Sequence, residues 1–200
     1  MSPEQVSESQ NCVVIGSGGR EHALAWKLLS SPSIEKVHVI PGNPGMAMGP
    51  GIDVHPKAKE IEEWLPLVEE LAPRFVVIGP EKPLVQGAAD LLRERNIPVI
   101  GPSQGASQLE GSKIFSKVLM GEFLIPTAGF KIAEHEQEGL EVLEEWDIEN
   151  KGVVIKADNL ASGKGVVVTY DREHAQKVVH DFLRNPECVV NADKLVFEEV

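Results

Sequence analysis

Cysteine is scarce in this sequence of 200 residues, and its histidines show no metal-binding spacing. The two cysteines, Cys12 and Cys188, lie far apart and form no C-x-x-C pair. A disulfide-stapled secreted domain and a cysteine-bound zinc are therefore not expected, and reduced thiols in a cytoplasmic protein are the simpler interpretation. The six histidines include no H-E-x-x-H pattern, so a histidine-bound metal is not expected either.

Positive charge is in deficit, and long apolar runs are missing. Lysine and arginine number 19 against 31 aspartates and glutamates, which leaves a net charge of −12. Nucleic acids and anionic membranes bind basic surfaces, so we expect neither as a partner. No apolar run approaches the roughly 18 residues of a membrane span, and the polar first residues are unlike a signal peptide. We therefore expect a cytoplasmic protein.

Two common phosphate-binding motifs are incomplete. Gly16 and Gly18 fit the dinucleotide fingerprint G-x-G-x-x-G, but Glu21 occupies the place of the third glycine. The second predicted strand, residues 36–40, ends without the acid that holds a ribose hydroxyl, so NAD binding is disfavoured. Neither LEGSKIFSK nor Gly163-Lys164-Gly165 matches the Walker A pattern, which excludes a P-loop NTPase.

The first half of the chain contains a regular alternation of apolar strands and helices. The predicted strands are residues 12–15, 36–40, 75–78 and 98–100, and glycine loops follow three of them. This alternation is typical of a parallel, Rossmann-like sheet, whose ligands bind beyond the carboxyl ends of the strands. The helix that follows Gly19 would offer its N-terminus to a phosphate, although glycine there also permits close helix packing.

The second half, from Thr127, has the pattern of a smaller α+β unit with an antiparallel pair at its centre. The predicted elements are a strand at 128–132, an acidic amphipathic helix at 134–149, strands at 153–155 and 166–168, a helix at 172–183 and a last strand at 194–200.

The lysines of this region have two open interpretations. The segment VVIKADNLASGKGVVV, residues 153–168, predicts a strand, a basic glycine-containing loop and a second strand. Lys156 and Lys164 could meet phosphate oxygens there, but an ordinary hairpin with solvated lysines fits equally well. Lys113 and Lys117 lie four residues apart on a predicted helix and, taken alone, are best interpreted as a solvated face.

Five motifs, taken together, resemble one family. In chain order they are GSGGREHALAW from Gly16, PGNPG from Pro41, VIGPEKPL from Val77, QLEGSK from Gln108 and KADNLASGKG from Lys156. They resemble the phosphoribosylamine–glycine ligases, also called glycinamide ribonucleotide synthetases, over about residues 13–200. The resemblance implies an α/β fold with three parts: a Rossmann-like pre-ATP-grasp domain at 11–110, a helical linker at 111–126, and a small α+β ATP-grasp lid subdomain at 127–200 that is truncated after the hinge strand.

The reaction implied by the resemblance is an ATP-dependent ligation in de novo purine biosynthesis. Glycine is joined to 5-phosphoribosylamine through glycyl phosphate, which gives glycinamide ribonucleotide, ADP and phosphate. ATP and Mg²⁺, or Mn²⁺, are the implied cofactors. Further purine-pathway domains in the same parent chain remain open.

The resemblance also assigns motif residues to two binding sites. Nucleotide contacts are implied for two lysines near the phosphates, a lid loop and a hinge strand: Lys113, Lys156, Leu160, Ser162, Gly163, Lys164, Gly165, Glu198, Glu199 and Val200. Phosphoribosylamine contacts are implied for three loops: Gly18, Gly19, Arg20, Asn43, Gly79, Pro80 and Glu81.

Length is the main departure from the family pattern. The family's metal ligands, a Glu and an Asn, its catalytic residues and much of its glycine site are expected beyond Val200, so we predict no metal or catalytic residue within this chain. We expect the 200-residue chain to be inactive alone. The alternative is a non-catalytic module, or truncated isoform, that binds a nucleotide or a phosphosugar.

Overall fold

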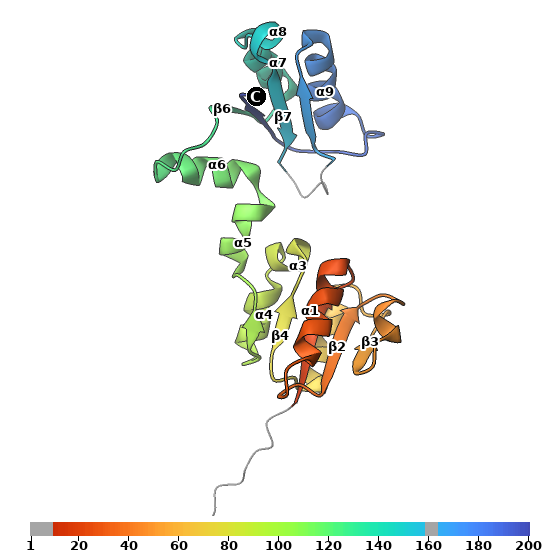
Figure 1. The fold of residues 1–200 in the computed structure, drawn as a ribbon. Helices are drawn as coiled ribbons and strands as arrows, with labels where there is room; N and C mark the ends of the chain where they lie inside the picture. Colours follow the sequence, from red (N-terminus) through yellow and green to blue (C-terminus); the bar gives the residue numbers. More distant parts are fainter. Residues whose placement is uncertain (1–9, 159–163) are drawn as a thin grey trace, which may run out of the picture. The chain divides into compact units, whose positions relative to one another are not determined.

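The computed structural model describes residues 10–158 and 164–200. The chain divides into two compact units, with the boundary between Ser107 and Gln108. Each unit has its own sheet and its own core (Figure 1). Three residues predicted to bind the nucleotide, Leu160, Ser162 and Gly163, lie outside the described residues.

The first unit is built on a parallel sheet of five strands. The strands are β1 Asn11–Gly16, β2 Lys36–Pro41, β3 Ile52–Val54, β4 Val76–Ile78 and β5 Val99–Ile100, in the order β3-β2-β1-β4-β5. Every neighbouring pair runs parallel. All of these strands therefore end at the same edge of the sheet, and the loops that follow them gather there.

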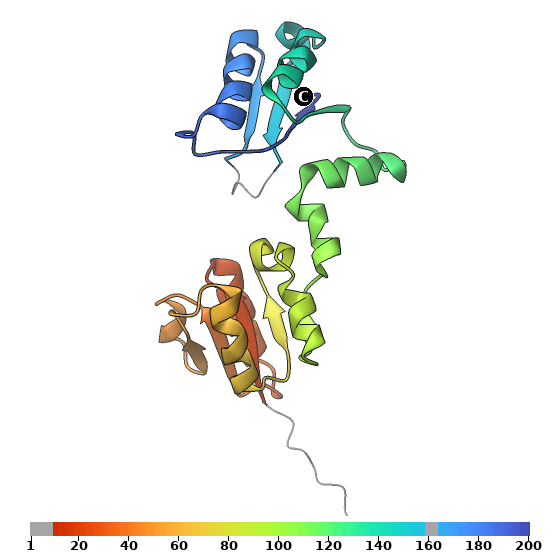
Figure 2. The same cartoon turned by 180° about the vertical axis from the view of Figure 1, so that it is seen from behind.

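Both faces of this sheet are buried, which explains why its strands are continuous apolar runs. Val13 and Ile15 of β1 point into a core with α2 and α4, while Cys12 and Val14 point into a second core with α1. The helix α1 lies in front of the sheet in Figure 1, and α2 covers the opposite face in Figure 2. The helices of this unit are α1 Gly19–Leu29, η1 Met46–Met48, α2 Ile61–Leu71, α3 Glu81–Val85 and α4 Ala88–Glu94.

The second unit contains an antiparallel sheet of four strands. They are β6 Phe130–Ala133, β7 Val153–Ala157, β8 Val166–Thr169 and β9 Leu195–Glu198, in the order β6-β9-β7-β8. The helices α7 Glu136–Glu144 and α9 Arg172–Arg184 cover one face, where they enclose Ile155, Leu195 and Phe197. The helix α6, Lys113–Glu122, precedes this sheet, and α5, Gln104–Gly111, spans the boundary between the units.

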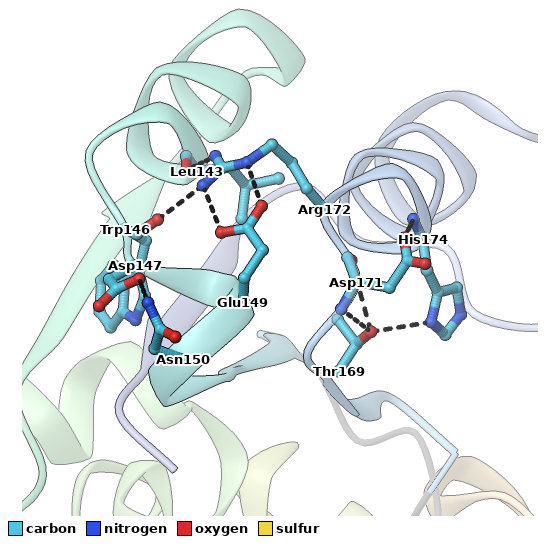
Figure 3. Close-up of polar contacts among 9 residues, drawn as sticks. All are labelled: Leu143, Trp146, Asp147, Glu149, Asn150, Thr169, Asp171, Arg172 and His174. Atoms are coloured by element: carbon cyan, nitrogen blue, oxygen red, sulfur yellow. Dashed lines mark hydrogen bonds and ion pairs between the residues drawn. The ribbon is translucent and has the colours of Figure 1, made fainter.

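An arginine at the start of α9 ties three elements of the second unit together (Figure 3). The guanidinium of Arg172 donates to the backbone oxygens of Leu143 and Trp146, at the end of α7 and just beyond it. It also forms a two-pronged ion pair with Glu149 of α8, Ile148–Lys151, at 2.9 and 3.1 Å. Because the last carbonyls of a helix lack partners within it, Arg172 stabilises the point where α7 stops.

The predicted fold class is confirmed, and the structure corrects some of its elements. The acidic helix predicted for 134–149 is two helices, α7 and α8, because Arg172 takes the backbone carbonyls at the break. The strand β3 was not predicted, since three residues with an exposed Asp53 at the centre are too short to show a pattern. The strands predicted at 128–132 and 194–200 are Phe130–Ala133 and Leu195–Glu198. Within the described residues, no helix is both long and apolar enough to span a membrane.

Candidate functional site

The face of the antiparallel sheet opposite α7 and α9 carries two rows of paired side chains. Strand register places Phe130, Glu198, Val154 and Val168 in one row, and Ile132, Val196, Lys156 and Val166 in the next. Residues that pair across strands point to the same face, and the residues between them form the core beneath α7 and α9. This face, which we call the open face, is apolar except for Glu198 and Lys156.

Glu198 is buried on the open face and accepts contacts from two lysines. Its Oε2 lies 2.7 Å from Nζ of Lys156, on the neighbouring strand β7. The same oxygen lies 3.2 Å from Nζ of Lys117, on α6. A buried carboxylate needs such partners, because desolvation of an unpaired charge costs several kcal/mol.

The start of α6 is attached to the end of β7 through its capping residues. The carboxylate of Asp158 accepts from the Ser112 hydroxyl and from the backbone N–H of Ile114, both at 3.1 Å. Ser112 is the N-cap of α6 and accepts from the backbone N–H of Phe115 at 3.0 Å. The LEGSK and KAD motifs, more than forty residues apart in the chain, therefore meet in space.

Lys113 follows this cap and lies against the same strand end. Its Nζ donates to the backbone oxygen of Ala157 at 2.8 Å. Burial lowers the pKa of the Lys113 ammonium, and the charge of Lys156 acts in the same direction, while Asp158 opposes both. Lys113 and Lys156 thus both lie at the end of β7, where their charges could neutralise a polyanion.

Lys117 contradicts the solvated face predicted from its spacing. It is only 9% exposed, and its ammonium contacts Thr127 Oγ1 at 2.7 Å and the Ala128 oxygen at 3.4 Å, besides Glu198. The Phe130 ring lies 5.7 Å away. Sequence reasoning missed this residue. The one available signal was its position one helical turn after Lys113, which places both on one side of α6.

In the first unit, the predicted substrate loops meet at the carboxyl edge of the parallel sheet. The side chain of Asn43 donates to the Ser17 oxygen at 2.8 Å, and Gly42 N–H donates to the Gly16 oxygen at 3.1 Å. Gly79 N–H donates to the Ile15 oxygen at 3.0 Å. The structure therefore brings together the loops that hold Gly18, Gly19, Arg20, Asn43, Gly79, Pro80 and Glu81.

Glu21 lies beneath these loops and was not among the predicted site residues. It is 4% exposed, and its carboxylate accepts from Gly18 N–H at 2.8 Å and from Arg20 Nε at 2.9 Å. A Cβ atom added at Gly16 or at Gly79 would lie 2.5 Å from its Cγ. The glycines therefore make room for a glutamate side chain. The signal was visible in the sequence as the glutamate in the third-glycine position.

Arg20 is an exposed cation of this edge. It pairs with Glu21 at 2.9 Å and with Glu81 at 3.6 Å, and the hydrogen bond to Glu21 raises the pKa of its guanidinium. Gly18 and Gly19 are exposed beside it, and Pro80 precedes Glu81 at the start of α3. At this edge the Arg20 guanidinium is therefore flanked by two carboxylates.

Two family models together cover the described chain. The phosphoribosylglycinamide synthetase N domain matches residues 10–110, and the ATP-grasp (A) domain of the same synthetase matches residues 111–200. The chain belongs to the phosphoribosylglycinamide synthetase family. Its fold is that of the N-terminal part of an ATP-grasp enzyme.

Curated relatives of this synthetase family match nearly the whole chain. Phosphoribosylamine–glycine ligase from Vibrio vulnificus (strain YJ016) is 38% identical over 190 residues, and the match covers 94% of this chain and 44% of the relative. The ligase from Escherichia coli (strain K12) is 40% identical over 188 residues, covering 94% and 43%. The chain spans less than half the length of these relatives.

A solved member of the family has the same fold. The crystal structure of phosphoribosylamine–glycine ligase from Thermotoga maritima superposes with a TM-score of 0.74 at 30% identity. It covers 95% of this chain, and the chain covers 44% of it. The Rossmann-like unit and the antiparallel unit are therefore those of the family's N-terminal portion.

The remaining residues expected from the synthetase family lie at the ends of the antiparallel strands. Lys164 is exposed, and the Gly165 oxygen accepts from Ala157 N–H at 2.8 Å, which closes the β7–β8 pair. Glu199 and Val200 are exposed beyond β9, where Glu199 N–H donates to the Gly129 oxygen at 3.2 Å. Among residues 10–158 and 164–200, no cluster of three His, Cys, Asp or Glu side chains could hold a metal.

A pocket of about 590 Å³ lies beside these last residues. Its lining includes Gly129, Trp146, Glu199 and Val200, but not Lys113, Lys117 or Lys156. The chemistry of the lysines, rather than the volume of this pocket, therefore marks the candidate nucleotide site.

Proposed function

We propose that this chain supplies the nucleotide- and phosphoribosylamine-binding portion of a phosphoribosylamine–glycine ligase. The observation that carries the proposal is the group of lysines beside the open face: Lys113 contacts the end of β7, and Lys156 and Lys117 contact the buried Glu198. It occurs in a chain whose second half matches the ATP-grasp domain of this family. The reaction is the ATP-dependent joining of glycine and 5-phosphoribosylamine.

The lysines bind the phosphates of the nucleotide, and the open face binds its base. Lys113 and Lys156 offer point charges to the phosphate oxygens, and this is the role for which lysine is suited. The exposed apolar side chains of the open face, such as Val166 and Val168, offer a surface for the base. Glu199 and Val200, just beyond β9, are exposed and could contact the edge of the base.

The loops of the first unit hold the second substrate. The exposed guanidinium of Arg20 suits a phosphate, while the exposed carboxylate of Glu81 suits an amine or hydroxyl groups. Phosphoribosylamine carries all three kinds of group. We propose residues 11–110 as the domain that binds it, residues 111–126 as the linker, and residues 127–200 as the small ATP-grasp subdomain.

A divalent cation completes the proposed chemistry, since Mg²⁺ neutralises the phosphate charge during transfer. The lysines of this chain neutralise phosphate charge in addition to the metal. The Glu and the Asn that would hold the ion are proposed to lie in the part of the family's length that this chain does not span.

Calorimetric titration tests the binding half of this proposal. We expect the chain to bind ATP in the presence of Mg²⁺, and Lys113→Ala and Lys156→Ala each to weaken that binding by about 1.5 to 3 kcal/mol. Lys177→Ala, which removes an exposed lysine of α9, is the matched control and should leave the affinity unchanged. Equal affinities for all four proteins would contradict the proposed site.

An assay of ADP release tests the catalytic half. Turnover that depends on both glycine and phosphoribosylamine would identify a complete ligase. Nucleotide binding without such turnover is the result expected of a binding portion.

A further inference from the structure

Two lysines contact a single oxygen of Glu198, and they differ in their exposure to solvent. Lys156 Nζ lies 2.7 Å from Oε2, and a quarter of its side chain is exposed on the open face. Lys117 Nζ lies 3.2 Å from the same oxygen, but its side chain is only 11% exposed.

Lys117 has a complete set of partners within the protein. An ammonium has three protons to donate, and Lys117 has three acceptors: Thr127 Oγ1 at 2.7 Å, the Ala128 oxygen at 3.4 Å and Glu198 at 3.2 Å. Phe130 stands beside this ammonium. A ligand that reaches the open face would therefore meet Lys156 and not Lys117.

Because both lysines contact the same oxygen of Glu198, Lys117 determines whether Glu198 keeps a counter-charge when Lys156 moves to a phosphate. With one partner, Glu198 would become a buried carboxylate without a counter-charge, and such a group is strongly unfavourable. With two partners, Glu198 keeps the ion pair to Lys117 when Lys156 leaves. The second pair therefore lowers the cost of moving Lys156.

We propose that Lys117 is a positioning residue that holds the charge of Glu198 and so frees Lys156 for the phosphates of a nucleotide. Lys117 acts through Glu198 and does not touch the ligand. This inference rests on the proposed nucleotide site and adds the exchange of ion pairs by which that site is engaged.

The first test compares a ligand that has phosphates with one that lacks them. In Lys117→Met, Lys156 becomes the one remaining lysine on Glu198, so we expect the affinity for ATP to fall about tenfold while that for adenosine changes less than about twofold. Lys131→Met also removes one positive charge from this unit, from an exposed pair with Glu145, and should change neither affinity. An equal loss of affinity for ATP and for adenosine would show that Lys117 contributes only to packing, and it would overturn the inference.

The second test needs no nucleotide and therefore fails independently of the proposed function. Acetic anhydride labels lysine amines, and mass spectrometry can follow Lys156 alone. Lys117→Met should slow this labelling, because Lys156 is then held by Glu198 without competition. Glu198→Gln should speed it, because the ion pair is lost. Circular dichroism confirms that each variant is folded.

The outcomes of the two tests separate the two proposals. If the unaltered chain does not bind ATP, the proposed function fails, and the labelling rates still decide whether Lys117 restrains the Glu198–Lys156 pair. Faster labelling of Lys156 in Lys117→Met would show simple loosening of the structure and would contradict the inference.

Discussion

At the scale of single residues, the first unit depends on a buried glutamate that glycines accommodate. Glu21 accepts from the N–H of Gly18 and pairs with Arg20, so it fixes the turn between β1 and α1. Gly79, which follows β4, leaves the space that the Glu21 side chain fills. The Glu21 side chain thus constrains both the glycine turn after β1 and the loop after β4, which are distant in sequence.

Gly79→Ala tests this packing. The new Cβ would lie 2.5 Å from Cγ of Glu21, so we expect the free energy of unfolding to fall by about 1 to 3 kcal/mol, the usual cost of overpacking. Urea unfolding measures the change. Gly105→Ala is the control, because a Cβ there meets nothing within 4 Å and glycine is unfavourable in a helix, so this variant should be neutral or slightly stabilised.

A second residue of this unit should make its stability depend on pH. His38 of β2 is buried, and its Nδ1 lies 3.1 Å from Nε2 of His55. Burial lowers the pKa of His38, the charges of His55 and Lys36 lower it further, and Asp53 opposes them. Protonation is therefore less favourable in the folded chain than in the unfolded chain.

The sign of the pH effect follows from this difference. We expect full stability above the ordinary histidine pKa of 6.5 and a loss as the pH falls below it, because the unfolded chain then takes up the proton first. Urea unfolding between pH 8 and 5 measures the slope, which should become smaller in His38→Gln. A slope unchanged by this substitution, or one lost equally in His22→Gln, would show that His38 is not its source.

At the scale of elements, the second unit is stabilised where helices meet at their ends. Arg172 is the first residue of α9, and its guanidinium forms an ion pair with Glu149 of α8. It also donates hydrogen bonds to backbone carbonyls at the end of α7 and just beyond it (Figure 3). Beside it, Asp171 caps α9 by accepting from His174 N–H at 2.8 Å. The guanidinium of Arg172 therefore connects the start of α9 with the end of α7 and with α8.

Arg172→Lys keeps the charge but loses the planar group that reaches three partners at once. We expect the free energy of unfolding of this unit to fall by about 1 to 3 kcal/mol, because backbone carbonyls lose their donors. Arg184→Lys, at the other end of α9, is the control. Its pair with Glu136 is exposed at 3.5 Å, so the change should stay within about 0.5 kcal/mol. Equal effects at both positions would contradict the special role of Arg172.

At the scale of the whole molecule, the chain consists of two units with separate cores. The clusters that bury both faces of the parallel sheet contain residues of the first unit, and the cluster beneath α7 and α9 contains residues of the second. Substitutions in separate cores are expected to act independently.

Hydrogen exchange resolved along the chain can test this independence. Gly79→Ala should accelerate amide exchange in β1, β2 and β4 and leave β7 and β9 unchanged, while Arg172→Lys should do the reverse. Acceleration of both sheets by one substitution would show that the two units unfold together.

The sequence by itself determined the alternation of elements and the family. These properties are local: apolar runs and glycine turns mark the strands of the first unit, and motifs such as GSGGREH keep their order along the chain. Element ends, the short strand β3 and the break between α7 and α8 were missed, because distant partners such as Arg172 decide them.

Only the tertiary structure decided which side chains act together. Helical spacing predicts that Lys113 and Lys117 lie on one side of α6, but it does not show which side of the helix faces the sheet. The burial of Lys117 against Glu198 therefore could not be predicted. The space for Glu21 likewise depends on Gly79, which lies on another strand end. Contacts between residues far apart in the chain leave no periodic trace in a single sequence, and the candidate site is made of such contacts.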